Sequence, residues 1–175
     1  MRRAFMAVFF VLASLVFGQA PIQTTHPGPE HKRLGYFAGD WTIEGDLKEN
    51  PLRIRGKFSG VEHNEWMRGG LFLISHIDQK GPSGEAAQLT VMGYDSEEKT
   101  YTYVAFSSTG AAEFAKGSFS NGTWTWTSVN KIAGDPTKSR FTVSQRSSTT
   151  FTFKYEMAPE GGDWSTVIEG KAVKR

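Results

Sequence analysis

The sequence contains no cysteine among its 175 residues. Disulfide bonds are therefore excluded, even in a compartment that would allow them. A lipid-anchored lipoprotein is excluded as well, because that class needs a cysteine at its cleavage site. A domain without cross-links has to derive its stability from the burial of apolar side chains.

Long apolar runs are also missing, apart from one at the start of the chain. Met1-Arg2-Arg3 supplies two positive charges, an apolar segment covers residues 4–17, and Gly18-Gln19-Ala20 places small residues where a signal peptidase cuts. This order is typical of a secretory signal peptide, and the run is shorter than the roughly 20 apolar residues that span a membrane. We expect residues 1–20 to be removed after Ala20, which leaves a secreted or periplasmic protein with no membrane span.

Neither sign of charge is in excess once the signal peptide is set aside. The full chain carries 20 Lys and Arg side chains and 18 Asp and Glu side chains. Because Arg2 and Arg3 leave with the signal peptide, 18 basic side chains remain to balance the 18 acidic ones. A near-neutral domain lacks the basic stripe of a nucleic-acid-binding protein, so we expect no nucleic-acid partner.

A helical period in the apolar residues is absent after Asp40. Short runs rich in Thr, Val, Phe, Tyr and Trp recur instead, separated by turn-forming residues, which favours many antiparallel strands in an all-β barrel or sandwich. Before them, residues 21–28 are predicted to be a flexible lead-in, and Pro29 can open a short helix that Gly39 ends. The expected strands are 41–48, 52–68, 71–78, 87–94, 100–107, 111–119, 123–130, 139–146, 150–158 and 164–173.

Two of the turns predict how their strands pair. Asn121-Gly122 is a strong signal for a two-residue hairpin and would place Phe119 opposite Trp124 and Gly117 opposite Trp126.

At the second turn, a three-residue loop over 147–149 pairs Val143 with Phe153 and Phe141 with Tyr155. A two-residue loop would split these apolar side chains between the faces, so the pattern favours the longer loop.

A third turn at Gly69-Gly70 pairs His63 with His76 and Glu65 with Ile74. Both faces of this hairpin are mixed in polarity, so its inner face is not assigned from the sequence.

Gly39-Asp40-Trp41 resembles the Gly-x-Trp signature that opens the first strand of lipocalins and related calycin barrels. The chain as a whole resembles a family of bacterial secreted proteins, domain of unknown function 1579, which is thought to be lipocalin-like. The residues that carry this resemblance are Pro29-Glu30-His31-x-x-Leu34, Gly69-Gly70 with Leu71-Phe72-Leu73, Gly93-Tyr94-Asp95 with Lys99-x-Tyr101, Ser107-x-x-Gly110 and Glu169-Gly170-Lys171-Ala172.

The resemblance implies one lipocalin-like, calycin-type antiparallel β-barrel of about 8–10 strands, covering residues 29–175 with a short N-terminal helix. In such barrels the tryptophan, here Trp41, closes one end beneath a basic side chain of the last strand. Lys171, Lys174 and Arg175 are the candidates for that side chain. The family has no established catalytic residues, so none is carried over.

Signatures of catalysis are largely absent. There is no Gly-x-Ser-x-Gly elbow and no glycine-rich phosphate loop. Ser96 and Lys99 match the Ser-x-x-Lys spacing of penicillin-recognising enzymes, but they lie in an expected hairpin loop rather than on a helix. No histidine follows His76, which argues against the haem site of nitrobindin-like barrels. The sequence favours a protein that is not an enzyme and needs no cofactor.

One cluster of residues could hold a metal. The expected register places His63 and His76 side by side with Glu65 on the same face, and two histidines with one carboxylate can bind zinc. The alternative is an exposed polar pair across two strands, which is common in sheets. A metal-dependent, zinc-type activity is therefore the second hypothesis.

Aromatic residues suggest the first hypothesis, a small and mostly apolar ligand bound inside the barrel. In the alternative, these side chains fill the barrel, and the protein is a structural module of the cell envelope that acts through protein contacts. The candidate ligand-binding residues are Phe72, Tyr103, Phe106, Trp124, Trp126, Phe141, Phe153 and Tyr155.

Overall fold

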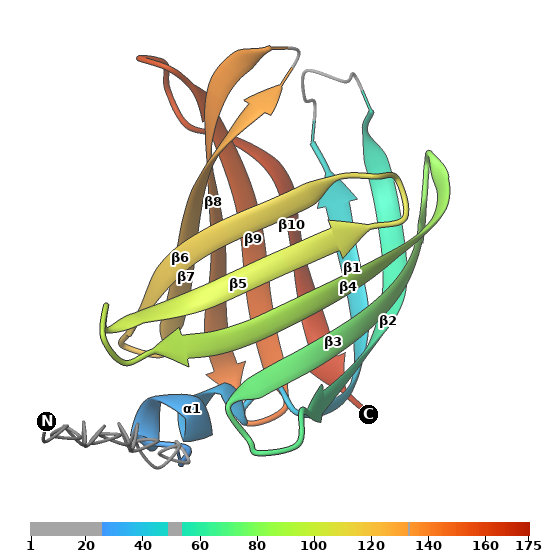
Figure 1. Ribbon diagram of the computed structural model, residues 1–175. Coiled ribbons are helices and arrows are strands. Elements are labelled where there is room, and N and C mark those ends of the chain that lie inside the picture. The colour runs from blue at the N-terminus through green and yellow to red at the C-terminus, as the bar shows by residue number, and fades with distance from the viewer. Residues whose placement is uncertain (1–25, 49–53, 133) are drawn as a thin grey trace, which may run out of the picture.

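A computed structural model describes residues 26–48, 54–132 and 134–175 as one closed barrel that is preceded in the chain by a short helix at its lower end (Figure 1). The expected signal peptide with its cleavage site and most of the lead-in lie outside the described residues. Within those residues, no helix is long and apolar enough to cross a membrane. The elements are α1 (Pro29–Leu34), β1 (Gly39–Leu47), β2 (Gly56–Trp66), β3 (Phe72–Gly81), β4 (Gly84–Asp95), β5 (Thr100–Ser107), β6 (Ala112–Ser120), β7 (Thr123–Ile132), β8 (Asp135–Ser147), β9 (Thr150–Pro159) and β10 (Ser165–Lys174).

The barrel has up-and-down topology, because each strand pairs with the next one along the chain and β10 returns to β1. All ladders are antiparallel, which short hairpin connections permit. Closure leaves no unpaired sheet edge among the described strands. The predicted fold, an all-β antiparallel barrel with one short N-terminal helix, is confirmed, and its strand count is the upper end of the expected range.

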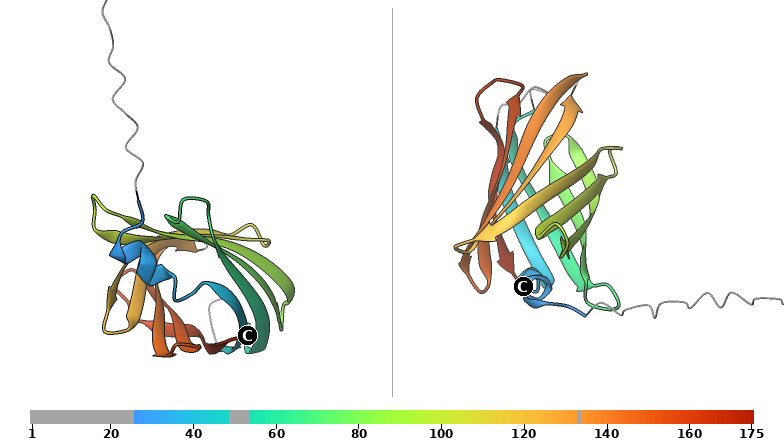
Figure 2. Two further views of the ribbon diagram at one scale, coloured as in Figure 1. Left: turned by 90° about the horizontal axis from the view of Figure 1, so that it is seen from below. Right: turned by 60° about the vertical axis from the view of Figure 1, so that its left-hand side comes forward.

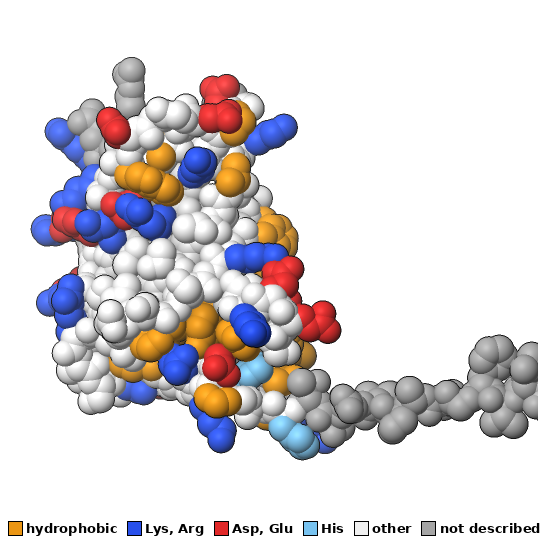
Figure 3. All heavy atoms as spheres, turned by 90° about the vertical axis from the view of Figure 1, so that its left-hand side faces the viewer, with side chains coloured by type: hydrophobic (Ala, Val, Ile, Leu, Met, Phe, Trp, Pro, Cys, Tyr) orange, Lys and Arg blue, Asp and Glu red, His pale blue; other side chains and the backbone are white. Residues whose placement is uncertain are grey.

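The inward and outward residues follow the two-residue period of a strand. On β7, Trp124 and Trp126 are buried whereas Thr127 is exposed. Figure 3 shows one side of the outer surface, where uncharged polar side chains and backbone cover much of the face, hydrophobic side chains gather near its lower and upper ends, and charged side chains lie at its margins and in its lower part.

The hairpin registers agree with the sequence. At the β6–β7 turn, Asn121 and Gly122 have φ values of 48° and 73°, as a type I′ turn requires, and Phe119 faces Trp124. Between β8 and β9, Val143 pairs with Phe153 as expected, although a bulge between Gln145 and Ser147 sets that register. The bulge absorbs the extra residue, so the turn itself is one residue tighter than the predicted loop.

One end of the barrel is closed by α1 and the residues that follow it, which lie across the opening seen from below in Figure 2. Leu34, Phe37, Trp41 and Trp124 are each at most 4% exposed there. The indole N–H of Trp41 donates to the Phe37 carbonyl oxygen at 2.6 Å, so the helix exit and the first strand are joined by a buried hydrogen bond.

The basic side chain over Trp41 is Lys174. Its Nζ lies 5.3 Å from the centre of a Trp41 ring, close enough for a cation–π contact. Lys171, another candidate, points outward and pairs with Glu44 at 3.5 Å. The lipocalin-like closure is therefore present with lysine as its cation.

Candidate ligand-binding site

A cavity of about 240 Å³ lies inside the barrel and receives side chains from all ten strands. The cavity adjoins the end of the barrel that α1 closes. Phe37, Trp126 and Phe151 belong both to the cavity lining and to the buried core. A cavity of about 150 Å³ holds benzene, so this one has room for a single ring with a short substituent. The barrel is thus filled at one end and hollow above it.

A larger depression lies elsewhere on the described surface and is a weaker candidate. It measures about 1050 Å³ and spreads over the outer face of β8, β9, β10, β1 and β2. Four of its charged side chains form ion pairs, Lys57 with Asp46 at 3.2 Å and Lys171 with Glu44 at 3.5 Å. Exposed pairs of this kind contribute little energy, and an open surface buries little of a small ligand, so we assign the interior cavity as the candidate site.

Aromatic rings form one wall of the cavity. The rings of Trp126 and Phe141 stack with centroids 6.0 Å apart, and Tyr103 lies 5.5 Å from Trp126. Phe153 continues the wall at 6.4 Å from Phe141. This arrangement follows from the β7–β8–β9 registers, which bring inward aromatics of adjacent strands into contact.

Glycines opposite these rings make the wall possible. Gly117 pairs with Trp126, Gly45 with Phe58, and Gly170 with Phe153. In each pair the ring covers the space that a glycine Cβ would occupy. Large rings can therefore face the interior without filling it.

A buried carboxyl group stands on β2. Glu62 is 8% exposed and accepts a hydrogen bond of 2.8 Å from the Ser75 hydroxyl on β3. Burial raises the pKa of Glu62 above its usual value of 4.5, and the Ser75 hydrogen bond opposes that rise. The nearby Asn64 side chain also lowers the pKa of Glu62, by less than Ser75 does, although the Asn64 amide forms no hydrogen bond that meets the usual geometry.

A second carboxyl group, Glu113 on β6, collects hydroxyl donors. Ser128, Ser139 and Tyr155 all donate to its Oε1 atom, at 2.6, 2.7 and 3.2 Å. Burial, followed by the charge of Glu113, raises the pKa of Tyr155 to about 12. Tyr155 therefore stays a neutral donor, and strands β7, β8 and β9 together hold this carboxyl in place.

Further polar groups lie between the two carboxyls. The Gln88 amide donates to the Thr90 hydroxyl at 3.1 Å and to the Tyr103 hydroxyl at 3.4 Å. Burial raises the pKa of Tyr103, so it too remains neutral. The cavity accordingly has an aromatic wall and a polar wall, which is the usual composition of a small-molecule site.

The predicted ligand-binding residues fall into three groups, which lie in the cavity lining, in the closed end of the barrel and on the outer surface. Tyr103, Trp126, Phe141, Phe153 and Tyr155 line the cavity. Trp124 is buried in the closed end against Phe37, with ring centroids 4.7 Å apart.

Phe72 and Phe106 are on the outer surface, 41% and 45% exposed, so they cannot line the interior. Their neighbours Leu73 and Ala105 point inward instead, because adjacent strand residues face opposite sides. Aromatic content alone did not reveal which face each residue occupies. Glu62 and Glu113 were missed for a related reason, because an acidic residue in a strand is ordinarily solvent-exposed.

The zinc hypothesis at His63, His76 and Glu65 is wrong. The two histidines do pair across β2 and β3, but all three side chains are exposed on the outer face. His63 instead forms a 2.8 Å hydrogen bond with Asp40. In the part of the chain that the structure describes, no group of three or more His, Cys, Asp or Glu residues could hold a metal ion.

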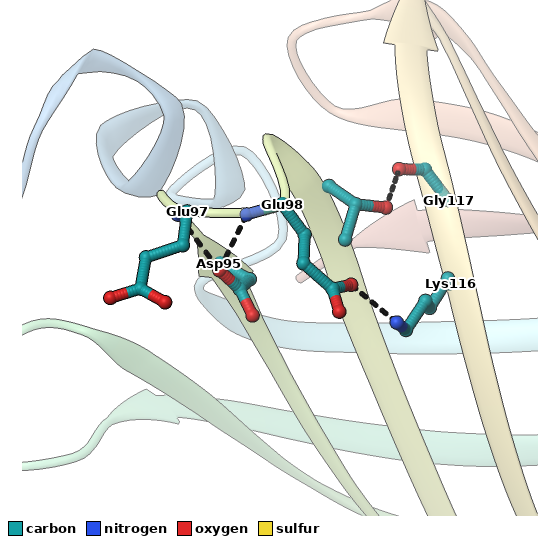
Figure 4. Close-up of polar contacts among 6 residues, drawn as sticks. Asp95, Glu97, Glu98, Lys116 and Gly117 are labelled. Atoms are coloured by element: carbon teal, nitrogen blue, oxygen red, sulfur yellow. Dashed lines mark hydrogen bonds and ion pairs between the residues drawn. The ribbon is translucent and has the colours of Figure 1, made fainter.

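The four residues that match Ser-x-x-Lys, 96–99, form a turn, as expected from their position between two strands. Residues 96–99 connect β4 to β5 without helix, and Asp95 accepts hydrogen bonds of 2.9 Å from the backbone N–H groups of Glu97 and Glu98 (Figure 4). The Glu98 side chain pairs with Lys116 on β6. Without a helical turn, Ser96 and Lys99 do not form a nucleophile and its base.

The family model for a protein of unknown function (DUF1579) matches residues 26–174. The chain belongs to this family. No curated protein matches it.

Among solved structures, the crystal structure of Rv2717c from M. tuberculosis is similar at 10% identity with a TM-score of 0.58, covering 85% of this chain and 98% of that one. The structure of EF1p2_mFAP2b bound to DFHBI has a TM-score of 0.47 at 10% identity, covering 83% and 98%. At 10% sequence identity, the similarity to Rv2717c shows that the two chains share a fold.

Replacement of Glu62 by glutamine should stabilise the protein at neutral and alkaline pH. A glutamine keeps the acceptor for Ser75 but removes the cost of burying a carboxylate. Because the folded pKa of Glu62 lies above 4.5, the folded state binds more protons than the unfolded chain just above that pH, and the free energy of unfolding falls as pH rises. We expect a gain on the order of 1–2 kcal/mol at pH 8 that disappears below about pH 4.5.

Urea unfolding of wild type and Glu62→Gln from pH 4 to pH 8 measures this difference. Glu65→Gln, three positions along the same strand and exposed, is the matched control and should leave the pH dependence unchanged. Parallel pH profiles for wild type and Glu62→Gln would contradict the prediction.

Proposed function

We propose that this is an exported, non-enzymatic protein that binds one small molecule inside its barrel. The observation that carries the proposal is the cavity of about 240 Å³, lined by side chains of every strand and bounded by a tightly packed end of the barrel. A barrel serving only as a structural module needs no such space, because unfilled volume in a core destabilises a protein. Export rests on the expected signal peptide.

The lining refines the kind of ligand. The sequence suggested a mostly apolar molecule, whereas the cavity offers an aromatic wall opposite Glu62, Gln88 and Glu113. Burial of a ring against the aromatic wall supplies affinity at roughly 25 cal/mol per Å² of apolar surface. A polar substituent is needed as well, because buried acceptors left without a donor would cost part of that gain.

Filling the cavity should abolish binding. Ala105 is buried in the cavity wall on β5, so Ala105→Phe would place a ring where the ligand sits. Phenethyl alcohol, which has one ring and one hydroxyl, is a suitable neutral probe. We expect saturable binding to wild type, with a shifted NMR signal of the Trp126 indole N–H, and at least roughly tenfold weaker binding to Ala105→Phe.

Ala87→Phe is the matched control, because Ala87 is exposed on the outside of β4. It should bind the probe as wild type does. Unchanged binding in Ala105→Phe would place the probe outside the cavity and overturn the proposal. The proposal would also be overturned if the wild-type protein did not bind the probe and if native mass spectrometry of protein purified from its natural host showed only the mass of the ligand-free chain.

A further inference from the structure

The charged groups that line the cavity are of one sign. Glu62 and Glu113 both contribute to the lining, and no Lys, Arg or His side chain of the described residues does. A charge taken from water into an interior is costly unless an opposite charge or several hydrogen-bond donors receive it. A charged ligand in this cavity would therefore meet acidic side chains and no basic ones among the described lining residues.

Glu113 is the carboxyl that is arranged to receive a ligand. Its three hydroxyl donors, Ser128, Ser139 and Tyr155, all meet the same oxygen, Oε1. The second oxygen, Oε2, accepts no hydrogen bond from the described residues, and Glu113 is only partly buried in the cavity wall. The carboxylate is thus fixed in orientation while one acceptor stays available.

A support behind the donors keeps this arrangement rigid. The Asn130 amide donates to Ser128 at 3.0 Å and to Ser139 at 3.4 Å. Ser128 and Ser139 are themselves no more than 9% exposed. A preorganised acceptor of this kind loses little entropy when a donor binds.

We propose that the ligand is a small organic ammonium ion, a protonated amine on a single ring or a short apolar chain, with its nitrogen on Glu113. The proposal rests on the function proposed above. The ammonium N–H groups would donate to Oε2, and charge-assisted bonds of this type are about twice as strong as neutral ones. The apolar body would lie against Trp126 and Phe141, the stacked pair of the aromatic wall.

Aromatic rings add a second attraction for a cation. Tyr103, Trp126 and Phe141 are in mutual contact, with centroids 5.5 to 6.0 Å apart, and all three line the cavity. The face of an aromatic ring carries negative potential and attracts a positive charge.

A carboxylate ligand such as a fatty acid meets the opposite situation. It would bring its negative charge beside the Glu113 carboxylate and the buried Glu62, and no cation among the described lining residues would compensate its desolvation. The cavity should reject such ligands.

Three probes with nearly the same body test the charge preference at pH 7: phenethylamine, phenethyl alcohol and phenylacetate. Isothermal titration should show phenethylamine binding at least roughly tenfold tighter than the alcohol, with phenylacetate not binding measurably. Glu113→Gln, which keeps the shape and an acceptor, should reduce amine affinity to that of the alcohol and leave alcohol affinity near its wild-type value. Retained alcohol binding shows that the variant is folded.

Glu98→Gln is the control, since Glu98 is an exposed acid in the β4–β5 turn, and it should not change any of the three affinities. If the alcohol binds and phenethylamine binds no tighter than phenylacetate, the ammonium proposal fails while the proposed function stands. If the amine preference survives in Glu113→Gln, the role of Glu113 is overturned. If no probe binds, the proposed function fails first.

Discussion

Replacement of Trp41 by alanine is expected to destabilise the protein by about 3–5 kcal/mol, a large part of the stability of a single domain. Trp41 is fully buried, and its ring packs on Phe151 with centroids 4.9 Å apart. The change also removes the indole donor to the Phe37 carbonyl and the ring beneath Lys174. The loss combines a large cavity with an orphaned buried carbonyl at the end that closes the barrel.

Equilibrium unfolding in urea measures this effect. Trp164→Ala removes the same side chain at a position that is 40% exposed and lies beneath Arg140, so it should cost less than about 1 kcal/mol. Trp41→Phe should fall between the two, because a ring remains but the N–H donor is gone. Equal losses for Trp41→Ala and Trp164→Ala would contradict the structural role of Trp41.

Replacement of Gly45 by alanine is expected to destabilise the protein by about 1–3 kcal/mol and to weaken ligand binding as well. A Cβ at this position would lie 2.6 Å from the Glu169 carbonyl oxygen and 2.6 Å from Cε1 of Phe58. The carbonyl belongs to the paired strand β10 and cannot move without breaking the closing ladder between β1 and β10. Phe58 lines the cavity as well as the outer depression, so a displacement of its ring changes the shape of the cavity wall.

Thermal unfolding and titration with phenethyl alcohol measure the two consequences. Gly28→Ala is the control, because a Cβ there would be 3.5 Å from the Glu30 carboxylate, an ordinary contact, and lies outside the barrel wall. Wild-type stability in Gly45→Ala would show that the strands tolerate the side chain and would remove the reason given for this glycine.

Local signals predicted the ladders of the barrel well. Asn121-Gly122 fixed the β6–β7 register, since φ values above zero at two successive positions leave few turn types. The aromatic pattern gave the β8–β9 register because a slip of one residue would move every ring to the other face.

The same reasoning could not place the β2–β3 hairpin. Both of its faces mix polar and apolar side chains, so alternation alone does not identify the inner face. In the structure Leu73 and Trp66 point inward while His63 and His76 are exposed, which removes the metal site and places Glu62 inside. Only the pairing of β2 with β1 and of β3 with β4 decides which face is buried.

The sequence by itself determined the strands, the turn chemistry, the short helix before Trp41 and the family, because each depends on residues close together in the chain. The tertiary structure decided that the barrel is hollow above its closed end and that Glu113 faces that space with donors from three other strands. Such features arise when residues as far apart as Glu113 and Tyr155 meet across the barrel. Closure of the barrel brings them together, and no local pattern encodes that distance.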